Sequence, residues 1–173
     1  DPVGGHDPYS SSKACVEILT ASWRRSFLER LGIRVASARA GNVLGGGDWS
    51  GDRLLPDFLR AMDTNKPLVI RSPHAIRPWQ HVLEPLSGYI LLAENLLDNL
   101  SNFAQAWNFG PNDEDAKPVG WMIQHLKAQC PDVQVTLDSS PQPHEANYLK
   151  LDISKARQSM GWQPRWPLAT ALE

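Results

Sequence analysis

Apolar positions in the first thirty residues recur with the spacing of an α-helix. Asp7 and Pro8 supply an N-cap residue and a proline at the first helical position, and Gly32 supplies a stop. Between them, a stripe of about six turns is formed by Cys15, Ile18, Leu19, Trp23 and Phe27. The pattern predicts one long amphipathic helix.

Helical and extended patterns then alternate along the chain. The pattern predicts strands at residues 33–39, 67–71, 107–109 and 133–137, and helices at residues 54–62, 85–100, 118–128 and 152–161. Five glycines fall within residues 41–51, which indicates a loop. Strands separated by helices favour an α/β fold with a largely parallel sheet, and the proline-rich second half favours a smaller lobe.

Composition excludes several classes of protein. The chain has 173 residues, a hydrophobic fraction of 42% and a net charge of -2, so it can bury a core and has no bulk attraction for nucleic acid. The longest apolar run, residues 89–93, is too short to cross a membrane. Two cysteines are too few for a disulfide framework. Two histidines seven residues apart, His74 and His81, do not make a metal site without a third ligand at short spacing. We expect a protein of the reducing cytoplasm without a metal.

Tyr9 and Lys13 are four residues apart at the start of the first predicted helix, which places them on one face. An ammonium about 4 Å from a phenol favours the phenolate by roughly 4 kcal/mol at an effective dielectric constant of about 20. Such a pair can act as a general base near neutral pH. The alternative is a capped helix whose lysine merely extends into solvent.

The context of this pair resembles the extended short-chain dehydrogenase/reductase family. Its motif sits in GGHDPYSSSK, and a later strand leads into ARAGNVLGGGDW. Four further strings, DRLLPD, RSPHAIRPWQHVLEP, WNFGPN and NYLKLDISKA, resemble the CDP-glucose 4,6-dehydratases of that family. The resemblance covers residues 1–173 in matching order and spacing.

The resemblance implies the C-terminal part of a Rossmann-like parallel-sheet domain together with a smaller mixed α/β substrate-binding lobe. Residues 1–45 would belong to the NAD-binding domain. Residues 46–173 would form mainly the nucleotide-sugar lobe, and residues 82–110 would return to the first domain.

The resemblance also implies a reaction on CDP-glucose with bound NAD as cofactor. Tyr9 would take the proton of the sugar 4-hydroxyl, Lys13 would bind the nicotinamide ribose, and Ala40 and Gly41 would lie at the nicotinamide amide. Oxidation at C4 acidifies the C5 hydrogen, so water leaves across C5 and C6 and the hydride returns to C6. The product would be a 4-keto-6-deoxy sugar for a bacterial surface polysaccharide.

Eight positions match the family's substrate-binding segments. Asn42 would lie near the diphosphate, although an asparagine after a strand is also a common turn residue. Arg53 and Arg77 would hold the diphosphate, because a guanidinium binds phosphate oxygens in pairs. The nucleobase would meet Val69 and Arg71, where many relatives carry an aromatic residue in place of the arginine.

Asn108, Glu145 and Tyr148 match positions around the nucleotide in the same family. For each of them a structural role is an equal alternative.

The chain begins without Met, and a glycine-rich βαβ turn does not appear in it. We therefore expect a fragment that is inactive alone, with the elimination residues preceding Tyr9 in a longer protein. The family implies a homodimer or higher homo-oligomer built on the Tyr-x-x-x-Lys helix. The alternatives are a dehydratase or epimerase of another nucleotide sugar, and a non-catalytic nucleotide-sugar binder.

Overall fold

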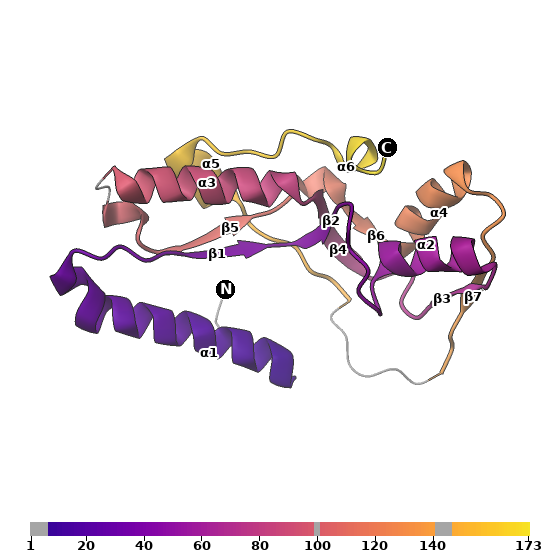
Figure 1. Cartoon of the computed structure of the whole chain (residues 1–173), viewed down its shortest axis with the longest axis horizontal. Helices are drawn as coiled ribbons and strands as arrows, with labels where there is room; N and C mark the ends of the chain where they lie inside the picture. The colour runs from indigo at the N-terminus through magenta and orange to yellow at the C-terminus, as the bar shows by residue number, and fades with distance from the viewer. Residues whose placement is uncertain (1–6, 99–100, 141–146) are drawn as a thin grey trace. The chain divides into compact units, whose positions relative to one another are not determined.

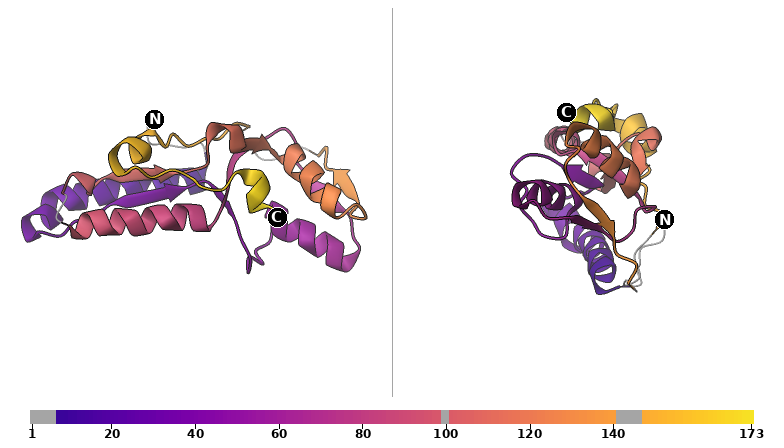
Figure 2. Two further views of the ribbon diagram at one scale, coloured as in Figure 1. Left: turned by 90° about the horizontal axis from the view of Figure 1, so that it is seen from above. Right: turned by 90° about the vertical axis from the view of Figure 1, so that its right-hand side faces the viewer.

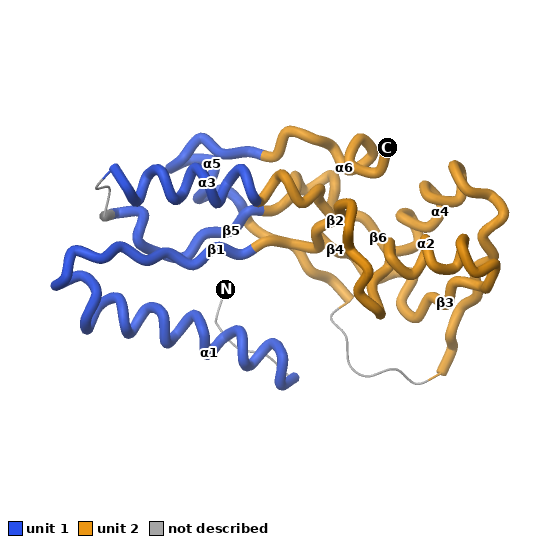
Figure 3. Tube along the Cα trace, in the orientation of Figure 1, with its two compact units in different colours: residues 1–39, 86–109, 153–163 blue, residues 40–85, 110–152, 164–173 orange. Residues whose placement is uncertain are grey.

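The computed structural model describes residues 7–98, 101–140 and 147–173 and divides into two compact units. Unit 1 contains residues 1–39, 86–109 and 153–163, and unit 2 contains the rest of the chain (Figure 3). Both units contain helices and strands, so the predicted α/β class is confirmed.

Unit 1 is built around the paired strands β1 (Ser37–Ala40) and β5 (Ala106–Phe109). The strands run between two long helices, α1 (Pro8–Trp23) and α3 (Leu83–Leu97), in Figure 1. A short helix, α5 (Ser154–Met160), completes the unit. Helix α1 continues as a π-helical turn and a 3₁₀ turn to Leu31.

The predicted ends of the first helix are confirmed. A carboxylate oxygen of Asp7 accepts a hydrogen bond from the Ser10 backbone N–H at 2.9 Å, as an N-cap requires. Gly32 ends the run with a φ of 69°, the left-handed conformation that glycine adopts without strain.

Aromatic rings fill the core of unit 1. Phe109 is fully buried, and its ring meets Trp162 at a centroid distance of 5.0 Å and Tyr89 at 5.5 Å. A Cβ on Gly88 of α3 would lie 2.2 Å from the Phe109 ring, so the helix approaches β5 closely only because this residue is glycine. These contacts pack α3, and the residue that follows the Gly161 cap of α5, against β5.

Unit 2 holds two small sheets. Strands β2 (Asn42–Leu44), β4 (Ile76–His81) and β6 (Ala116–Pro118) form the first, with β2 parallel and β6 antiparallel to β4. Strands β3 (Leu68–Ile70) and β7 (Val135–Leu137) form a parallel pair.

Three helices belong to unit 2: α2 (Leu54–Thr64), α4 (Val119–Gln129) and α6 (Leu168–Ala171). Phe58 of α2 and Ile123 of α4 are buried with Leu68 and Ile70 of β3 in one cluster. Met122 and Leu168 are buried with Leu44 and Trp79 in another. Figure 2 gives two further views of these elements.

The structure corrects the expected strand pattern at several places, and the strand expected at residues 133–137 begins only at Val135. The strand expected at residues 33–39 begins only at Ser37. Strand β2 lies where a loop was expected, because its three residues, between Gly41 and Gly45, pair with β4. Strands β4 and β6 were missed, since Pro78 and Pro118 argue against a strand when read locally.

Helix α5 has Ile153 at its N-cap position, one residue later than expected, and Gly161 ends it with a φ of 64°. Both cysteines are free thiols. In the described part of the chain, none of the helices has the length and apolar character needed to cross a membrane.

Candidate functional site

Tyr9 and Lys13 share one face near the start of α1, as their spacing predicts. The Lys13 ammonium lies 5.4 Å from the centroid of the Tyr9 ring. Both side chains are exposed, Tyr9 to 72% of its surface. A phenol and a cation are thus available together to a bound molecule, which is the arrangement that general-base chemistry by tyrosine needs.

Glu17 continues the same face of α1 and attaches the helix to β1. Its Oε1 accepts a hydrogen bond from Arg39 Nε and its Oε2 accepts one from Ser37 Oγ, both at 2.7 Å. Hydrogen bonding from Arg39 lowers the pKa of Glu17 and raises that of the guanidinium. The sequence predictions did not include this carboxylate.

Ala40 is the last residue of β1, and Gly41 and Asn42 follow it into β2. A Cβ on Gly41 would lie 2.3 Å from the carbonyl oxygen of Pro78, so only glycine permits this approach of the two backbones. Asn42 is half-buried and lies opposite Trp79 in the parallel register with β4. Gly41 therefore has a packing role, whether or not it also approaches a ligand.

Arg77 lies on β4, the middle strand of its sheet, and exposes only 7% of its surface. Its Nη1 donates to the Ile76 carbonyl at 3.0 Å. A buried guanidinium is costly unless it is hydrogen-bonded, and it keeps its charge in any environment. Its position is set by the strand and its packing.

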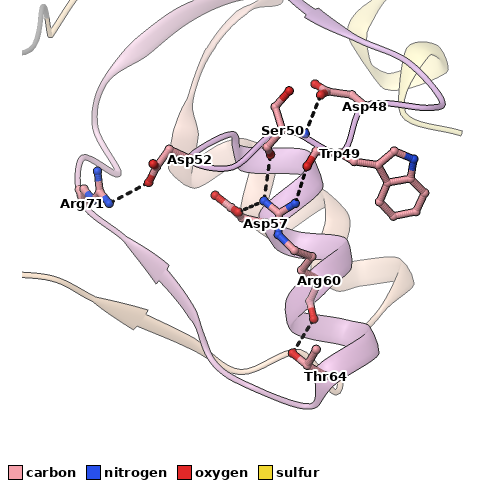
Figure 4. A network of polar contacts seen from close by, with 8 residues as sticks. All are labelled: Asp48, Trp49, Ser50, Asp52, Asp57, Arg60, Thr64 and Arg71. Atoms are coloured by element: carbon pink, nitrogen blue, oxygen red, sulfur yellow. Dashed lines mark hydrogen bonds and ion pairs between the residues drawn. The ribbon is translucent and has the colours of Figure 1, made fainter.

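Arg53 and Arg71 are both exposed and both pair with carboxylates of the segment 48–53. Arg53 Nη1 lies 3.1 Å from Asp48 Oδ2, and Arg71 Nη2 lies 3.0 Å from Asp52 Oδ1 (Figure 4 draws the latter pair). Hydrogen bonding from Ser50 is the largest effect that lowers the pKa of Asp48. Two guanidinium groups are thereby gathered beside one loop.

Arg60 of α2 holds this loop, and the sequence predictions missed it. Its Nη1 donates to the Trp49 carbonyl at 3.0 Å and its Nη2 donates to the Ser50 carbonyl at 2.9 Å (Figure 4). The guanidinium also pairs with Asp57, one turn earlier on the helix. Side-chain bonds to backbone carbonyls across ten residues leave no spacing signature in a sequence, which explains the omission.

The remaining predicted residues have simpler surroundings. Val69 on β3 is 57% exposed. Tyr148 is 60% exposed, lies beside Ile76 in an isolated bridge, and has the Lys150 ammonium 5.6 Å from its ring centroid. Glu145 lies outside the described residues.

Asn108 belongs to unit 1, where its Oδ1 accepts a hydrogen bond from Arg39 at 3.1 Å. This contact supports the structural alternative for Asn108.

The predicted site residues thus form two groups. Tyr9 and Lys13 lie together in unit 1, whereas Arg53 and Arg71 meet the same loop in unit 2. Among the residues that the structure describes, there is no group of three or more His, Cys, Asp or Glu suited to a metal ion. His81 instead accepts a hydrogen bond from the Leu83 backbone and meets the Trp166 ring.

Sequence comparison matches the family model described as GDP-mannose 4,6 dehydratase to residues 1–173. The chain is 51% identical over 178 residues to a CDP-glucose 4,6-dehydratase of Salmonella typhimurium, covering 99% of this chain and 50% of that protein. It is 25% identical over 178 residues to a dTDP-glucose 4,6-dehydratase of Haemophilus influenzae, covering 95% and 49%. The chain spans about half the length of the curated relatives it matches.

Solved structures share the fold. A dTDP-glucose 4,6-dehydratase of Bacillus anthracis in complex with NAD matches with a TM-score of 0.80 at 18% identity, covering 99% of this chain and 51% of that one. The NAD-dependent NDP-hexosamine 5,6-dehydratase TunA matches with a TM-score of 0.80 at 22% identity, covering 98% and 52%. At these identities the match shows a shared α/β architecture.

Proposed function

The chain belongs to the GDP-mannose 4,6-dehydratase family, and from this premise we propose that it is part of a CDP-glucose 4,6-dehydratase. The observation that carries the proposal is the exposed pair of Tyr9 and Lys13 on one face of α1, within a chain 51% identical to such an enzyme. The proposed reaction converts CDP-glucose into water and a CDP-4-keto-6-deoxy sugar, with no net oxidation.

The residues present suit the nicotinamide ribose of NAD. A ribose offers hydroxyl groups, and the Tyr9 phenol and Lys13 ammonium are exposed hydrogen-bonding groups side by side. NAD bound there would supply a reversible hydride acceptor for the oxidation at C4. We propose that Ala40 and Gly41 lie beside the nicotinamide amide.

In this mechanism Tyr9 accepts the proton of the sugar 4-hydroxyl as a phenolate. Lys13 stabilises that phenolate by its positive charge, because it is the cation on the same helical face. The 4-ketone acidifies the hydrogen on C5, which permits loss of the 6-hydroxyl as water. We assign no described residue of this chain to that elimination.

The nucleotide part of the substrate is assigned to unit 2. Arg53 and Arg77 would neutralise the diphosphate with Asn42 nearby, and Val69 and Arg71 would meet the cytosine. The guanidinium groups of Arg53 and Arg71 support this, because both side chains are 58% exposed and ion pairs at such sites are weak enough for a bound nucleotide to compete with them. Glu145 and Tyr148 would complete the nucleotide site. We further propose a cytoplasmic homodimer.

The experiment compares CDP-, dTDP- and UDP-glucose as substrates of the complete gene product, with the 4-keto product followed by its absorbance in alkali. We expect CDP-glucose to have the highest kcat/KM, by about tenfold or more. Arg71→Gln should reduce this preference, because Arg71 is assigned to the base.

The matched variant Arg53→Gln should weaken the binding of all three substrates alike, because all three contain the diphosphate. Turnover of none of the three, or faster turnover of dTDP-glucose than of CDP-glucose, would overturn the proposal. Nucleotide-sugar binding without turnover would favour the non-catalytic alternative.

A further inference from the structure

Arg71 and Asp52 form an ion pair between two segments that are separated in the sequence. Arg71 Nη2 lies 3.0 Å from Asp52 Oδ1, and Figure 4 shows the two side chains directed toward each other. Both are open to solvent, with side chains 58% and 81% exposed. A carboxylate, which accepts hydrogen bonds, and a guanidinium, which donates them, are thus presented together on the surface of unit 2.

The backbone that carries each member of the pair is held in place. Arg71 follows directly on β3, whose first and last residues are buried. Asp52 has a φ of 57°, a left-handed conformation that aspartate and asparagine adopt more readily than most residues with a side chain. The loop before Asp52 is held by two hydrogen bonds from Arg60 to backbone carbonyls. The strand and the loop therefore place the two groups before a ligand binds, which reduces the cost of ordering them.

An acceptor beside a donor matches cytosine better than the other pyrimidines. Along its Watson–Crick edge cytosine has an amino group at position 4, which donates, and N3 and O2, which accept. Uracil and thymine have a carbonyl oxygen at position 4 and an N–H at position 3. With position 4 at Asp52 and position 3 at Arg71, cytosine pairs with both side chains. In the same position uracil brings oxygen against the carboxylate and N–H against the guanidinium.

The rest of the nucleotide would fix which part of the base meets which side chain. Uracil displaced by one position could bring its N3–H to Asp52, so the ion pair alone does not select cytosine. Arg53 follows Asp52 in the chain and is the residue proposed to hold the diphosphate, and Cα atoms of successive residues are about 3.8 Å apart. A nucleotide held at the diphosphate therefore has little freedom to slide its base along the pair.

We propose that Asp52 is a specificity-determining residue, which accepts a hydrogen bond from the 4-amino group of cytosine while Arg71 donates to N3 or O2. This inference rests on the proposed function, because that function places the base at Arg71 and the diphosphate at Arg53. Without a nucleotide the two side chains bond to each other. Cytosine offers each of them a replacement partner of the same kind.

A surface ion pair with no ligand is the competing explanation. Exposed pairs contribute little to stability, and losing such a pair leaves the preference between substrates unchanged. The ion pair of Arg53 and Asp48 provides a matched control, because it belongs to the same loop, joins atoms 3.1 Å apart and has an equally exposed guanidinium. Asp48 is assigned to neither the base nor the diphosphate, so its substitution should affect all nucleotides alike.

The test compares CDP-glucose with UDP-glucose in the complete gene product, because these substrates differ only at positions 3 and 4 of the base. The quantity measured is the ratio of their kcat/KM values. Asp52→Asn should lower this ratio about tenfold, because the amide nitrogen can donate to the uracil oxygen. Asparagine also accepts the left-handed backbone, so the loop keeps its conformation. Asp48→Asn should leave the ratio within about twofold of that of the unchanged protein.

Two results would show that Asp52 does not select the base. In one, Asp52→Asn keeps the ratio within about twofold of the original value. In the other, Asp48→Asn lowers the ratio as much as Asp52→Asn does. If Asp52→Asn does not fold, Asp52→Gly decides, because glycine adopts the left-handed conformation without strain and removes the carboxylate.

Dissociation constants for CDP and UDP, measured by calorimetric titration, separate this inference from the proposed function. If no nucleotide sugar is turned over, the proposed function fails. A preference for CDP over UDP that Asp52→Asn abolishes would still support the assignment of Asp52. Equal affinity of the unchanged protein for the two nucleotides would overturn it.

Discussion

Helix α1 and the packed pair of α3 and β5 belong to the same unit, yet different interactions hold them. Phe109 of β5 is fully buried and meets two aromatic rings, and α3 approaches it through Gly88. On α1 the large apolar side chains are exposed, and Glu17 attaches the helix to β1 by hydrogen bonds to Ser37 and Arg39. Arg24, in the turn that continues the helix, donates to the Val35 carbonyl in the segment before β1.

The segment 48–53 in unit 2 is also held by hydrogen bonds from a side chain. Its backbone carbonyls at Trp49 and Ser50 are held by Arg60. Helix α1 and the segment 48–53, which carry Tyr9, Lys13 and Arg53, thus have directed polar contacts as their described attachments, whereas α3 and β5 are held by packing. Substitutions should therefore divide into those that unfold the protein and those that reduce function in a folded protein.

The largest expected effect is the loss of packing at Phe109. Phe109→Ala removes a fully buried ring, and such changes cost about 3–5 kcal/mol of unfolding free energy. Trp23→Ala on α1 is the matched change at an exposed ring, 53% exposed, and should cost about 0.5 kcal/mol. Denaturant unfolding measures both, and equal losses would mean that the contrast between the two regions is wrong.

The next effect is on nucleotide affinity through Arg60. Arg60→Ala frees the backbone of the segment 48–53, which should weaken binding of CDP-glucose about fivefold by removing two hydrogen bonds of roughly 0.5–1.5 kcal/mol each. Calorimetric titration measures the dissociation constant.

The control for this variant is Thr64→Ala. Thr64 Oγ1 donates only to the Arg60 carbonyl among the contacts drawn in Figure 4, so the guanidinium keeps its bonds. Affinity should stay within about twofold of the unchanged protein. Equal weakening by the two variants would show that the helix, and not the guanidinium, supports the loop.

The smallest effect is the pH dependence contributed by Glu17. Hydrogen bonding from Arg39 holds its pKa in the folded state below the usual value of 4.5. The contribution of Glu17 to the unfolding free energy is therefore complete at pH values above its pKa in the unfolded chain. It is lost as the pH falls through its lower pKa in the folded protein. The difference in unfolding free energy between the unchanged protein and Glu17→Gln should be about 1 kcal/mol or less at neutral pH.

Titration in denaturant at several pH values checks this dependence. The difference between the two proteins should shrink as the carboxylate becomes protonated. A difference that stays constant down to about pH 3 would show that the charge of Glu17 contributes nothing.

Local chemistry made much of the fold predictable. The Asp7 cap, the Gly32 stop and the periodic apolar positions predicted the long helix, because each acts within a few residues. Strand β4 was not predictable in this way, since its pairing with β2 and β6 outweighs the local effect of Pro78.

The residues of the candidate site also divide into those that local spacing predicts and those that it does not. Tyr9 and Lys13 were predictable because helical spacing alone brings them together. The contacts of Arg60 with Trp49 and Ser50, and of Glu17 with Ser37 and Arg39, depend on how the chain folds back on itself. Neither set has a spacing that the sequence could reveal.

Turnover of CDP-glucose by Tyr9→Phe in the complete gene product tests the proposed chemistry most directly. The substitution removes the phenolic oxygen and keeps the ring, so affinity for CDP-glucose should stay within about twofold of the unchanged protein. We predict that kcat falls about a hundredfold or more, the usual contribution of a general base. A variant that keeps more than about a tenth of the original rate would contradict the assignment of Tyr9 as the base.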